Sequence, residues 1–294
     1  MVVKRINAVL INVLPQRAHA LVKNSYLKWK RRNLKEISET EFRDILLKEL
    51  HITRGSVVFV HSSLNNIKLG FSFLKILPIL KEMVGEEGTL LFPAAHFLER
   101  AEEYLRKENI FDIAKSPSRM GLLSELARRD KHAVRSLHPT NSVVAIGKHA
   151  RELTGNHHKD IFPCGIMSPY FRIVDYDGII VGIGVSTDYL SFVHCVEDTK
   201  EYSFPIETRC KEIFRAQVRK SDGEIILVKT LAAHPRIRYR NIPLFMKKHI
   251  PGETAKDFNV KGANLFKANA KALYNQMGNL AAKKITIYTK KAFD

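Results

Sequence analysis

A histidine and a glutamate stand three residues apart in the stretch DYLSFVHCVEDTKEY, residues 188–202. The apolar residues of this stretch predict a helix, on which His194 and Glu197 would share one face. A carboxylate beside an imidazole fixes the tautomer of the ring and favours its protonated form. This pairing suits a general base that takes a proton from an amine or a hydroxyl. The alternative interpretation is an ion pair without a chemical role.

Polar residues also follow two of the predicted strands. The strand GSVVFVHSSL ends in His61, Ser62 and Ser63, and Asp188 follows the glycine-rich strand GIIVGIGV. In α/β proteins, ligands bind at the carboxyl ends of parallel strands and at the helix starts beyond them. We therefore expect these residues to lie near the helix of His194, at one edge of a sheet.

The stretch SPSRMGLLSEL, residues 116–126, predicts the start of a helix. Ser118 would cap this helix, which leaves the amides of Arg119, Met120 and Gly121 without partners inside it. Such amides bind phosphate groups, and the Arg119 guanidinium would add a charged donor. An ordinary capped helix is the alternative.

A further polar group stands at the start of the segment RSLHPTNSVVAIG, residues 135–147. It consists of Arg135, Ser136 and His138, directly before a predicted strand. From the residues alone, this group is either a polar turn or one part of an active site.

The remaining pattern alternates strands with helices, which is typical of an α/β fold with parallel segments. Ser38 and Glu41 form a capping-box sequence, and the helix FSFLKILPILKEMV is interrupted at Pro78. The stretch EIFRAQVRKSDGEIILVKT predicts an antiparallel hairpin. We predict a single elaborate α/β domain over residues 38–294, with a mixed, partly parallel sheet flanked by helices. Residues 1–37 would form a basic amphipathic helical extension.

The composition is that of a folded chain. The 294 residues are 45% hydrophobic and 27% charged, and no run of about 18 apolar residues predicts a membrane span. The three cysteines lack C-x-x-C spacing, so we expect neither a disulfide framework nor a metal site. A reducing compartment, the cytoplasm, is the expected location.

Most of the net charge of +18 lies near the two ends of the chain. Residues 1–35 contain nine Lys and Arg and no acid, and residues 247–294 contain ten Lys and three acids. Because no basic stripe crosses the body of the chain, we expect no specific nucleic-acid partner. The basic N-terminal residues, with Trp29 among them, suit the anionic inner face of a membrane. A helix packed on the domain is the alternative.

Taken together, six segments resemble the aminoglycoside 3-N-acetyltransferase family, also called the antibiotic N-acetyltransferases. In chain order they are VHSSL, GEEGTLLFP, SPSRMGLLSE, RSLHPTNSVVAIG, GIMSPYFRI and GIIVGIGVSTDYLSFVHCVE. The resemblance extends over about residues 38–250. It implies the α/β fold of that family and the transfer of an acetyl group from acetyl-CoA to an amine, often on an aminosugar, without a metal.

The resemblance also implies roles for the residues described above. His194 matches the histidine base of the family, and Glu197 matches its acidic companion. The residues expected near coenzyme A are His61, Ser62, Ser63, Ser118, Arg119, Met120 and Gly121. The residues expected near the acceptor are Arg135, Ser136, His138 and Asp188.

The residues expected around the acceptor depart from the pattern of the family. Members that inactivate aminoglycosides tend to have acidic clefts, whereas here Ala94 and Ala95 stand where polar residues are usual and the body of the chain is nearly neutral. We therefore expect acetylation of an aminosugar in surface polysaccharide biosynthesis. An aminoglycoside acceptor, which would confer antibiotic resistance, is one alternative. A non-catalytic membrane or nucleic-acid adaptor on the same fold is another.

Overall fold

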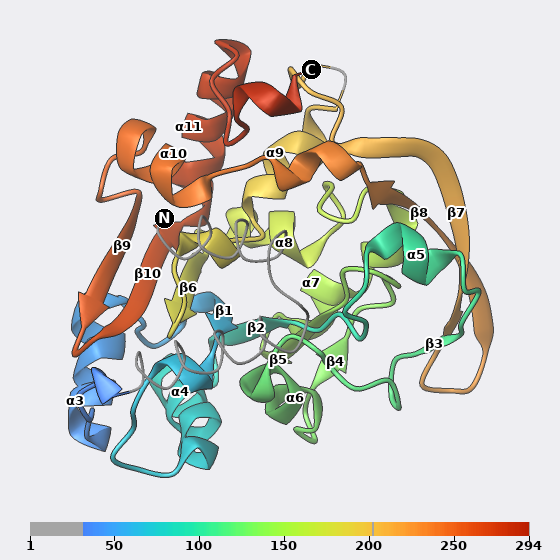
Figure 1. Cartoon of the computed structure of the whole chain (residues 1–294). Helices are drawn as coiled ribbons and strands as arrows, with labels where there is room; N and C mark the ends of the chain where they lie inside the picture. Colours follow the sequence, from blue (N-terminus) through green and yellow to red (C-terminus); the bar gives the residue numbers. More distant parts are fainter. Residues whose placement is uncertain (1–31, 202, 294) are drawn as a thin grey trace, which may run out of the picture.

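A mixed sheet lies at the centre of the molecule (Figure 1), a computed structural model that describes residues 32–201 and 203–293. In the order β4-β5-β2-β1-β6-β10-β9, its strands are Val134–Arg135, Val143–Gly147, Thr89–Pro93, Val57–Ser62, Ile179–Ile183, Ala263–Asn269 and Ala255–Val260. Strand β1 runs parallel to β2 and β6, and the other neighbours pair antiparallel. The carboxyl ends of β1, β2 and β6 therefore meet at one edge of the sheet.

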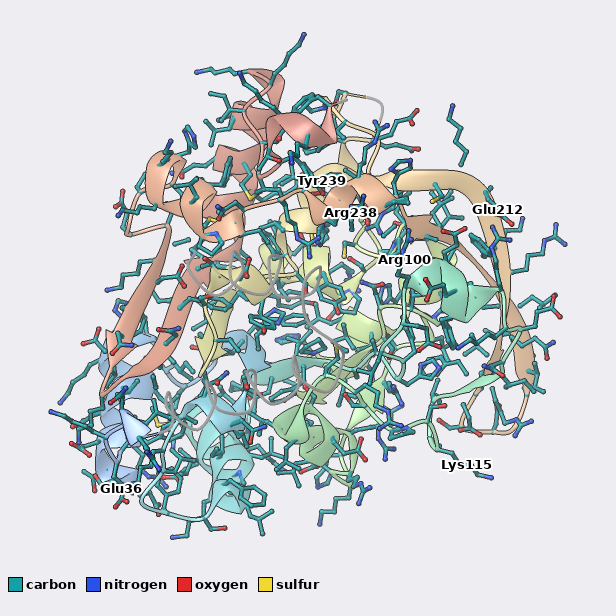
Figure 2. The ribbon with its side chains drawn as sticks, viewed as in Figure 1. Glu36, Arg100, Lys115, Glu212, Arg238 and Tyr239 are labelled. Carbon is teal, nitrogen blue, oxygen red and sulfur yellow. The ribbon has the colours of Figure 1, made fainter. Side chains whose placement is uncertain are left out.

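A second, smaller sheet stands beside the first (Figure 1). It combines β3 (Phe111–Asp112) with the long hairpin of β7 (Arg209–Arg219) and β8 (Ile225–Ala233), as the sequence predicts for residues 212–230. An ion pair between Arg106 and Glu212, 2.6 Å long, joins this hairpin to the helix before β3; Figure 2 labels Glu212 on it.

Helices cover both faces of the central sheet. The α-helices are α3 (Glu39–Asp44), α4 (Ile76–Val84), α5 (Ala101–Leu105), α6 (Leu122–Arg128), α7 (Ala150–Thr154), α8 (Pro169–Arg172), α9 (Val193–Thr199), α10 (Ile242–His249) and α11 (Ala270–Ala282). A π-helix, Ile45–Glu49, continues α3, and 3-10 turns occupy Leu64–Asn66, Phe73–Lys75, His157–Lys159, Ile173–Tyr176, Thr187–Tyr189, Pro235–Arg238 and Lys290–Ala292. In the described part of the chain, no helix has the length and apolarity that a membrane crossing requires.

The central strands are buried on both faces. Along β1, Phe59 packs into the core cluster that contains residues of α7, α9, α10 and α11, whereas Val58 and Val60 pack into the cluster with α3, α4 and α6. This alternation follows from the two-residue period of a strand. It explains why the sequence shows a continuous apolar run here, as is usual for parallel strands covered on two sides.

Two predictions about helices can be compared directly with the structure. The capping box is confirmed, since the Ser38 hydroxyl accepts from the amide of Glu41 while the Glu41 carboxylate accepts from the amide of Ser38. The predicted interruption at Pro78 is wrong, because Pro78 lies in the first turn of α4. An amide at that position has no partner within a helix, so a proline there removes no hydrogen bond.

The C-terminal residues fold as part of the domain. Strands β9 and β10 extend the central sheet next to β6, and α11 packs its residue Leu273 into the core. Residues 234–250 and 282–293 contain no acid. They contribute the exposed cations Arg238, Lys247, Lys248, Lys283, Lys284, Lys290 and Lys291, which we call the C-terminal basic face. Figure 2 labels Arg238 on this face.

The N-terminal extension lies almost entirely outside the described residues. Its predicted amphipathic helix and membrane contact therefore stay predictions. Residues 34–37 pack on the domain: Leu34 and Ile37 are buried, and the Lys35 amide donates to the carbonyl of Lys261.

Candidate active site

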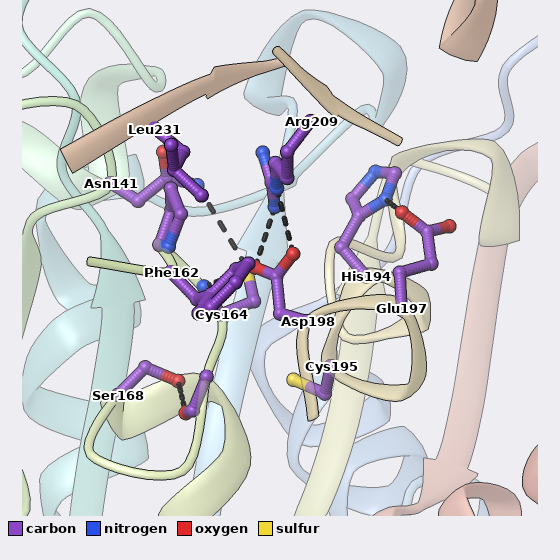
Figure 3. A network of polar contacts seen from close by, with 12 residues as sticks. Asn141, Phe162, Cys164, Ser168, His194, Cys195, Glu197, Asp198, Arg209 and Leu231 are labelled. Carbon is purple, nitrogen blue, oxygen red and sulfur yellow. Dashed lines mark hydrogen bonds and ion pairs between the residues drawn. The ribbon is translucent and has the colours of Figure 1, made fainter. Parts of the chain in front are cut away.

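Helix α9 brings the predicted pair of side chains into contact. His194 Nδ1 lies 2.8 Å from Glu197 Oε2 (Figure 3). A carboxylate only accepts hydrogen bonds, so Nδ1 carries the proton and Nε2 keeps its lone pair. The Glu197 side chain is 2% exposed, whereas the His194 side chain is 17% exposed. The pair is thus a base whose orienting carboxylate is buried while the ring reaches solvent.

The Glu197 carboxylate is held ionised in this buried position. Burial by itself would raise its pKa, but the charge and hydrogen bond of His194, with smaller effects of Arg209 and Tyr288, hold the pKa below its usual range. Tyr288 donates from its hydroxyl to Glu197 Oε1 at 2.8 Å. Both carboxylate oxygens therefore have a donor.

An ion pair stands directly behind this pair of residues. Asp198 accepts two hydrogen bonds from the Arg209 guanidinium, 2.7 and 2.6 Å long, and a third from the amide of Cys164. Figure 3 shows Arg209 reaching down from the strand above to Asp198 on α9. The bidentate geometry ties the start of β7 and the loop of Cys164 to the helix that carries His194.

His61, Ser62 and Ser63 lie at the carboxyl end of β1, as predicted. His61 is 5% exposed, and its ring stacks on Phe59 at 5.2 Å. Burial lowers the pKa of His61 to about 3, so the ring is neutral. Its Nε2 is buried and has no hydrogen-bond partner among the residues that the structure describes. A buried polar atom of this kind has an unmet requirement that a ligand can fill.

Gly121 meets the end of β1 from the other side. A Cβ placed on Gly121 would lie 3.3 Å from the carbonyl oxygen of Ser62. The structure therefore brings together the two segments for which the sequence predicts a coenzyme site, residues 61–63 and 118–121. Arg119 is exposed between them, and Met120 is half-buried.

The predicted cap at Ser118 is wrong. Helix α6 begins at Leu122, with Gly121 as its N-cap at a φ of +104°. This left-handed conformation suits glycine and cannot continue a helix, so the helix cannot include residues 119–121. The amides of Arg119 and Met120 are already bonded, to the Ala95 carbonyl and the Ser118 hydroxyl. A phosphate site built from these two amides is therefore excluded, while the Arg119 side chain stays available.

Arg135 has a structural place that the sequence did not indicate. It is 8% exposed, and its guanidinium donates to the carbonyls of Ala94, Ile113 and Ser116 and to the Ser142 hydroxyl. Its charged carbon also lies 4.6 Å from the centre of the Phe111 ring. The predicted contact of Arg135 with the acceptor is thus replaced by a packing role between both sheets.

Ser136 and His138 are likewise enclosed. Ser136 donates to Nδ1 of His157 at 2.9 Å, and His157 Nε2 donates to the Pro163 carbonyl. The two imidazole rings, His138 and His157, stack with their centres 4.5 Å apart, and each is 0% exposed. His138 Nε2 pairs with Thr230 at 3.3 Å. These residues join the two sheets, so their predicted acceptor contact is also replaced.

Asp188 lies at the sheet edge as expected. It belongs to the 3-10 turn after β6, half-buried next to Thr187. Thr187 donates from its amide and its hydroxyl to the carboxylate of Asp257 on β9, at 2.7 and 2.6 Å. This contact fixes the turn, so Asp188 stays a candidate for binding the acceptor.

A cavity of about 310 Å³ shares Glu197 as part of its wall. Glu201 and Glu207 also line it, and both are exposed. Sequence reasoning missed these two residues, which follow the helix of His194. A larger groove of about 1050 Å³ lies at the opposite edge, and none of the predicted site residues lines it.

Sequence reasoning also missed Asp198, Arg209 and Tyr288. Tyr288 is 91 residues from Glu197, and no local spacing connects them. Across residues 32–201 and 203–293, no cluster of three or more His, Cys, Asp or Glu side chains is arranged to hold a metal ion.

Comparisons with known proteins identify the family to which the sequence is similar. A family model described as aminoglycoside 3-N-acetyltransferase matches residues 59–280, more than half of the chain. Aminoglycoside N(3)-acetyltransferase IX of Micromonospora chalcea is 28% identical over 200 residues, which cover 60% of this chain and 70% of that protein. An SPbeta prophage-derived aminoglycoside N(3')-acetyltransferase-like protein of Bacillus subtilis, YokD, is 29% identical over 168 residues, 51% of this chain and 61% of that one.

Solved structures show the same fold. Aminoglycoside acetyltransferase AAC(3)-Xa superposes with a TM-score of 0.72 at 19% identity, covering 90% of this chain and 99% of that one. A binary complex of AAC-IIIb with coenzyme A has a TM-score of 0.68 at 19% identity and covers 87% of this chain and 100% of that one. The predicted α/β architecture with a mixed sheet is thereby confirmed.

The buried histidines predict a loss of stability in acid. Burial lowers the pKa of His61 and His157 to about 3, and burial with the neighbouring His157 charge lowers that of His138 well below its usual value. Above about pH 6.5 folded and unfolded chains are both neutral at these sites; below it only the unfolded chain takes up protons. The free energy of unfolding should fall by about 4 kcal/mol per pH unit near pH 5, about 1.4 for each histidine.

Urea unfolding between about pH 7.5 and pH 5 measures this slope above the range in which carboxylates titrate. His157→Gln should reduce the slope by about 1.4 kcal/mol per pH unit, since one of these buried sites is removed. The exposed His132→Gln is the matched control and should leave it unchanged. A free energy of unfolding that is flat over this range contradicts the assignment.

Proposed function

Because the chain belongs to the aminoglycoside 3-N-acetyltransferase family, we propose that it transfers the acetyl group of acetyl-CoA to an amino group of an aminosugar of the aminoglycoside class. The family is one of acyltransferases that use acetyl-CoA as co-substrate. The observation that carries the proposal is the contact between His194 and the buried Glu197, 2.8 Å long, at the edge where β1 and β6 end.

A thioester is already activated toward attack by an amine. The protein therefore needs mainly to position the two substrates and to transfer a proton. The amine nitrogen attacks the carbonyl carbon of the acetyl group, a C–N bond forms and the C–S bond breaks. His194 Nε2 takes the proton that the amine loses, and the coenzyme leaves as a thiolate that acquires a proton to become the free thiol. Glu197 stabilises the imidazolium that forms during the transfer. Orientation of the two substrates supplies much of the remaining rate.

The two adjoining segments at the end of β1 fit coenzyme A. The neutral, partnerless Nε2 of His61 and the hydroxyls of Ser62 and Ser63 offer polar contacts to its amide-containing arm. Gly121 permits close approach of a ligand to the backbone, since it has no side chain. Arg119 is exposed beside it and would pair with a phosphate of the coenzyme.

The cavity beside the pair of residues favours a cationic acceptor. Its wall contains Glu197, Glu201 and Glu207, and its two cations, Arg209 and Lys211, are paired with Asp198 and Glu207. Carboxylates suit the ammonium groups of an aminosugar. The relatives named above are aminoglycoside acetyltransferases or similar to them, which favours an aminoglycoside over an intermediate of polysaccharide biosynthesis. Asp188, at the same edge of the sheet, is a further candidate for this contact.

A turnover assay tests the proposal. Release of the coenzyme thiol from acetyl-CoA is followed with aminoglycosides, simple aminosugars and nucleotide-linked aminosugars as acceptors. We expect acetylation of aminoglycosides. Turnover confined to nucleotide-linked aminosugars would support the polysaccharide pathway instead, and binding of acetyl-CoA without transfer to any acceptor would support the adaptor.

Loss of the base should reduce turnover. His194→Ala should lower kcat by about 10²- to 10⁴-fold, the usual scale for a general base, with acetyl-CoA affinity nearly unchanged. Glu197→Gln should cost less, because the ring and its Nε2 remain. Steady-state kinetics with acetyl-CoA binding by calorimetry measure both, and His132→Ala is the control. Near-normal turnover of His194→Ala at neutral pH would exclude this role.

Loss of the phosphate contact should act on binding. Arg119→Ala should raise the KM for acetyl-CoA by about tenfold and change kcat little, since the contact is equally strong in ground and transition states. Arg151→Ala, which removes another exposed charge, at the opposite groove, is the matched control. A loss confined to kcat would show that Arg119 does not hold the coenzyme.

A further inference from the structure

Tyr288 completes a line of three hydrogen-bonded side chains. Its hydroxyl donates to Glu197 Oε1 at 2.8 Å, while Glu197 Oε2 accepts from His194 Nδ1 at 2.8 Å. Tyr288 is 7% exposed and Glu197 is 3% exposed, so water has little access to either group. The orientation of the carboxylate therefore depends on protein donors at both of its oxygens.

The backbone around Tyr288 is fixed independently of α9. The Asn241 amide donates to the Ile287 carbonyl at 2.9 Å, and the Thr289 amide donates to the Tyr239 carbonyl at 2.8 Å. Arg240 and Tyr288 form an isolated antiparallel bridge. The hydroxyl is thus positioned by the segment before α10 and not by the helix it contacts.

Tyr288 also lies beyond the residues that the family model matches. The family model ends at residue 280, whereas Tyr288 belongs to the C-terminal segment that follows α11. This segment is buried through Ile287, Tyr288 and Ala292. Its tyrosine hydroxyl reaches the candidate active site and is bonded to Glu197.

We propose that Tyr288 is a positioning residue, which holds the Glu197 carboxylate in the orientation that meets His194 Nδ1 and so keeps His194 Nε2 available as the base. The inference rests on the proposed acetyl transfer for its kinetic consequences but not for its geometry. Tyr288 acts through Glu197 and does not itself touch a substrate.

The charges around Glu197 decide the direction of the effect. On α9 itself these are His194 and Asp198; from other elements they are Arg209, Tyr288 and, next to the tyrosine, Arg240. Glu201 lines the same cavity. Burial and the Glu197 charge raise the pKa of the Tyr288 hydroxyl well above its usual value, so it remains a donor throughout the working range.

Removal of the hydroxyl leaves Oε1 of a buried carboxylate without a donor. The pKa of Glu197 then rises, since one of the groups that lower it is gone. Where the carboxylate is still ionised, its charge is no longer stabilised by the tyrosine hydroxyl and therefore favours the imidazolium form of His194 more strongly. A protonated Glu197 no longer orients the base by accepting from His194 Nδ1, and the stronger field of the ionised carboxylate reduces the fraction of free base in mild acid. Both changes therefore move the acidic limb of the rate profile to higher pH.

The test is Tyr288→Phe in the full chain. We expect kcat to fall about tenfold, the scale of a lost hydrogen bond to a charged group, with the KM for acetyl-CoA within about twofold of the wild-type value. The acidic limb of kcat/KM should move up by about half a pH unit or more. An unchanged limb, together with an unchanged kcat, overturns the inference.

Tyr274→Phe is the matched control. The Tyr274 hydroxyl lies 2.8 Å from the Thr199 hydroxyl at the end of the same helix, so its loss removes one hydrogen bond of α9 without touching a carboxylate. Both variants should melt at similarly reduced temperatures. A shift of the acidic limb in both variants to the same extent would show a general loosening of α9, and would also overturn the inference.

A readout without turnover separates this inference from the proposed function. Histidine labelled at its ring carbon allows the titration of His194 to be followed by NMR, with the signal assigned by its absence in His194→Gln. In Tyr288→Phe the midpoint should move by about half a pH unit, whether or not an acceptor is known. A shifted midpoint in a chain that acetylates no acceptor would leave the positioning role intact and refute the proposed function. An unshifted midpoint in an active enzyme would do the opposite.

Discussion

The candidate active site depends on a carboxylate that is ionised and almost wholly removed from water. Such a group is stable only when protein donors replace its lost hydration. Glu197 meets this requirement with His194 on its own helix and Tyr288 from the end of the chain. The next residue of the helix, Asp198, meets it with Arg209 and the Cys164 amide. Helix α9 is therefore the element on which three distant parts of the chain converge.

Close backbone packing supplies the second constraint. Gly184 follows β6 and has a φ of +73°. It lies so close to Ser63 that a side chain there would overlap the Ser63 carbonyl. Gly121 approaches Ser62 from the opposite direction. The end of β1 is thus enclosed between two glycine contacts, which leave no room for larger residues at these two positions. These contacts place the predicted coenzyme residues and the turn that leads to α9 at one edge of the sheet.

The sequence predicts well whatever is local. The contact of His194 with Glu197 follows from a three-residue spacing, and the capping box at Ser38 follows from another. It fails where long-range packing decides: Gly121 adopts a left-handed conformation that displaces the start of α6, and Arg135 is drawn into a buried network between two sheets. The role of Tyr288 could not be predicted from local spacing, because its contact with Glu197 depends on how the C-terminal segment packs on the domain.

The distribution of charge explains how a chain of net charge +18 can hold a cationic acceptor. The cations of the C-terminal basic face are exposed, and salt screens their field over roughly 8 Å under physiological conditions. Carboxylates that line a small cavity act on an ammonium group at contact distance, where screening is weak. For the proposed acceptor, the carboxylates of Glu197, Glu201 and Glu207 at the cavity wall therefore matter more than the overall charge. From its composition, the near-neutral body of the chain argued against a polycationic acceptor. Because the local carboxylates matter more, it does not conflict with an aminoglycoside acceptor.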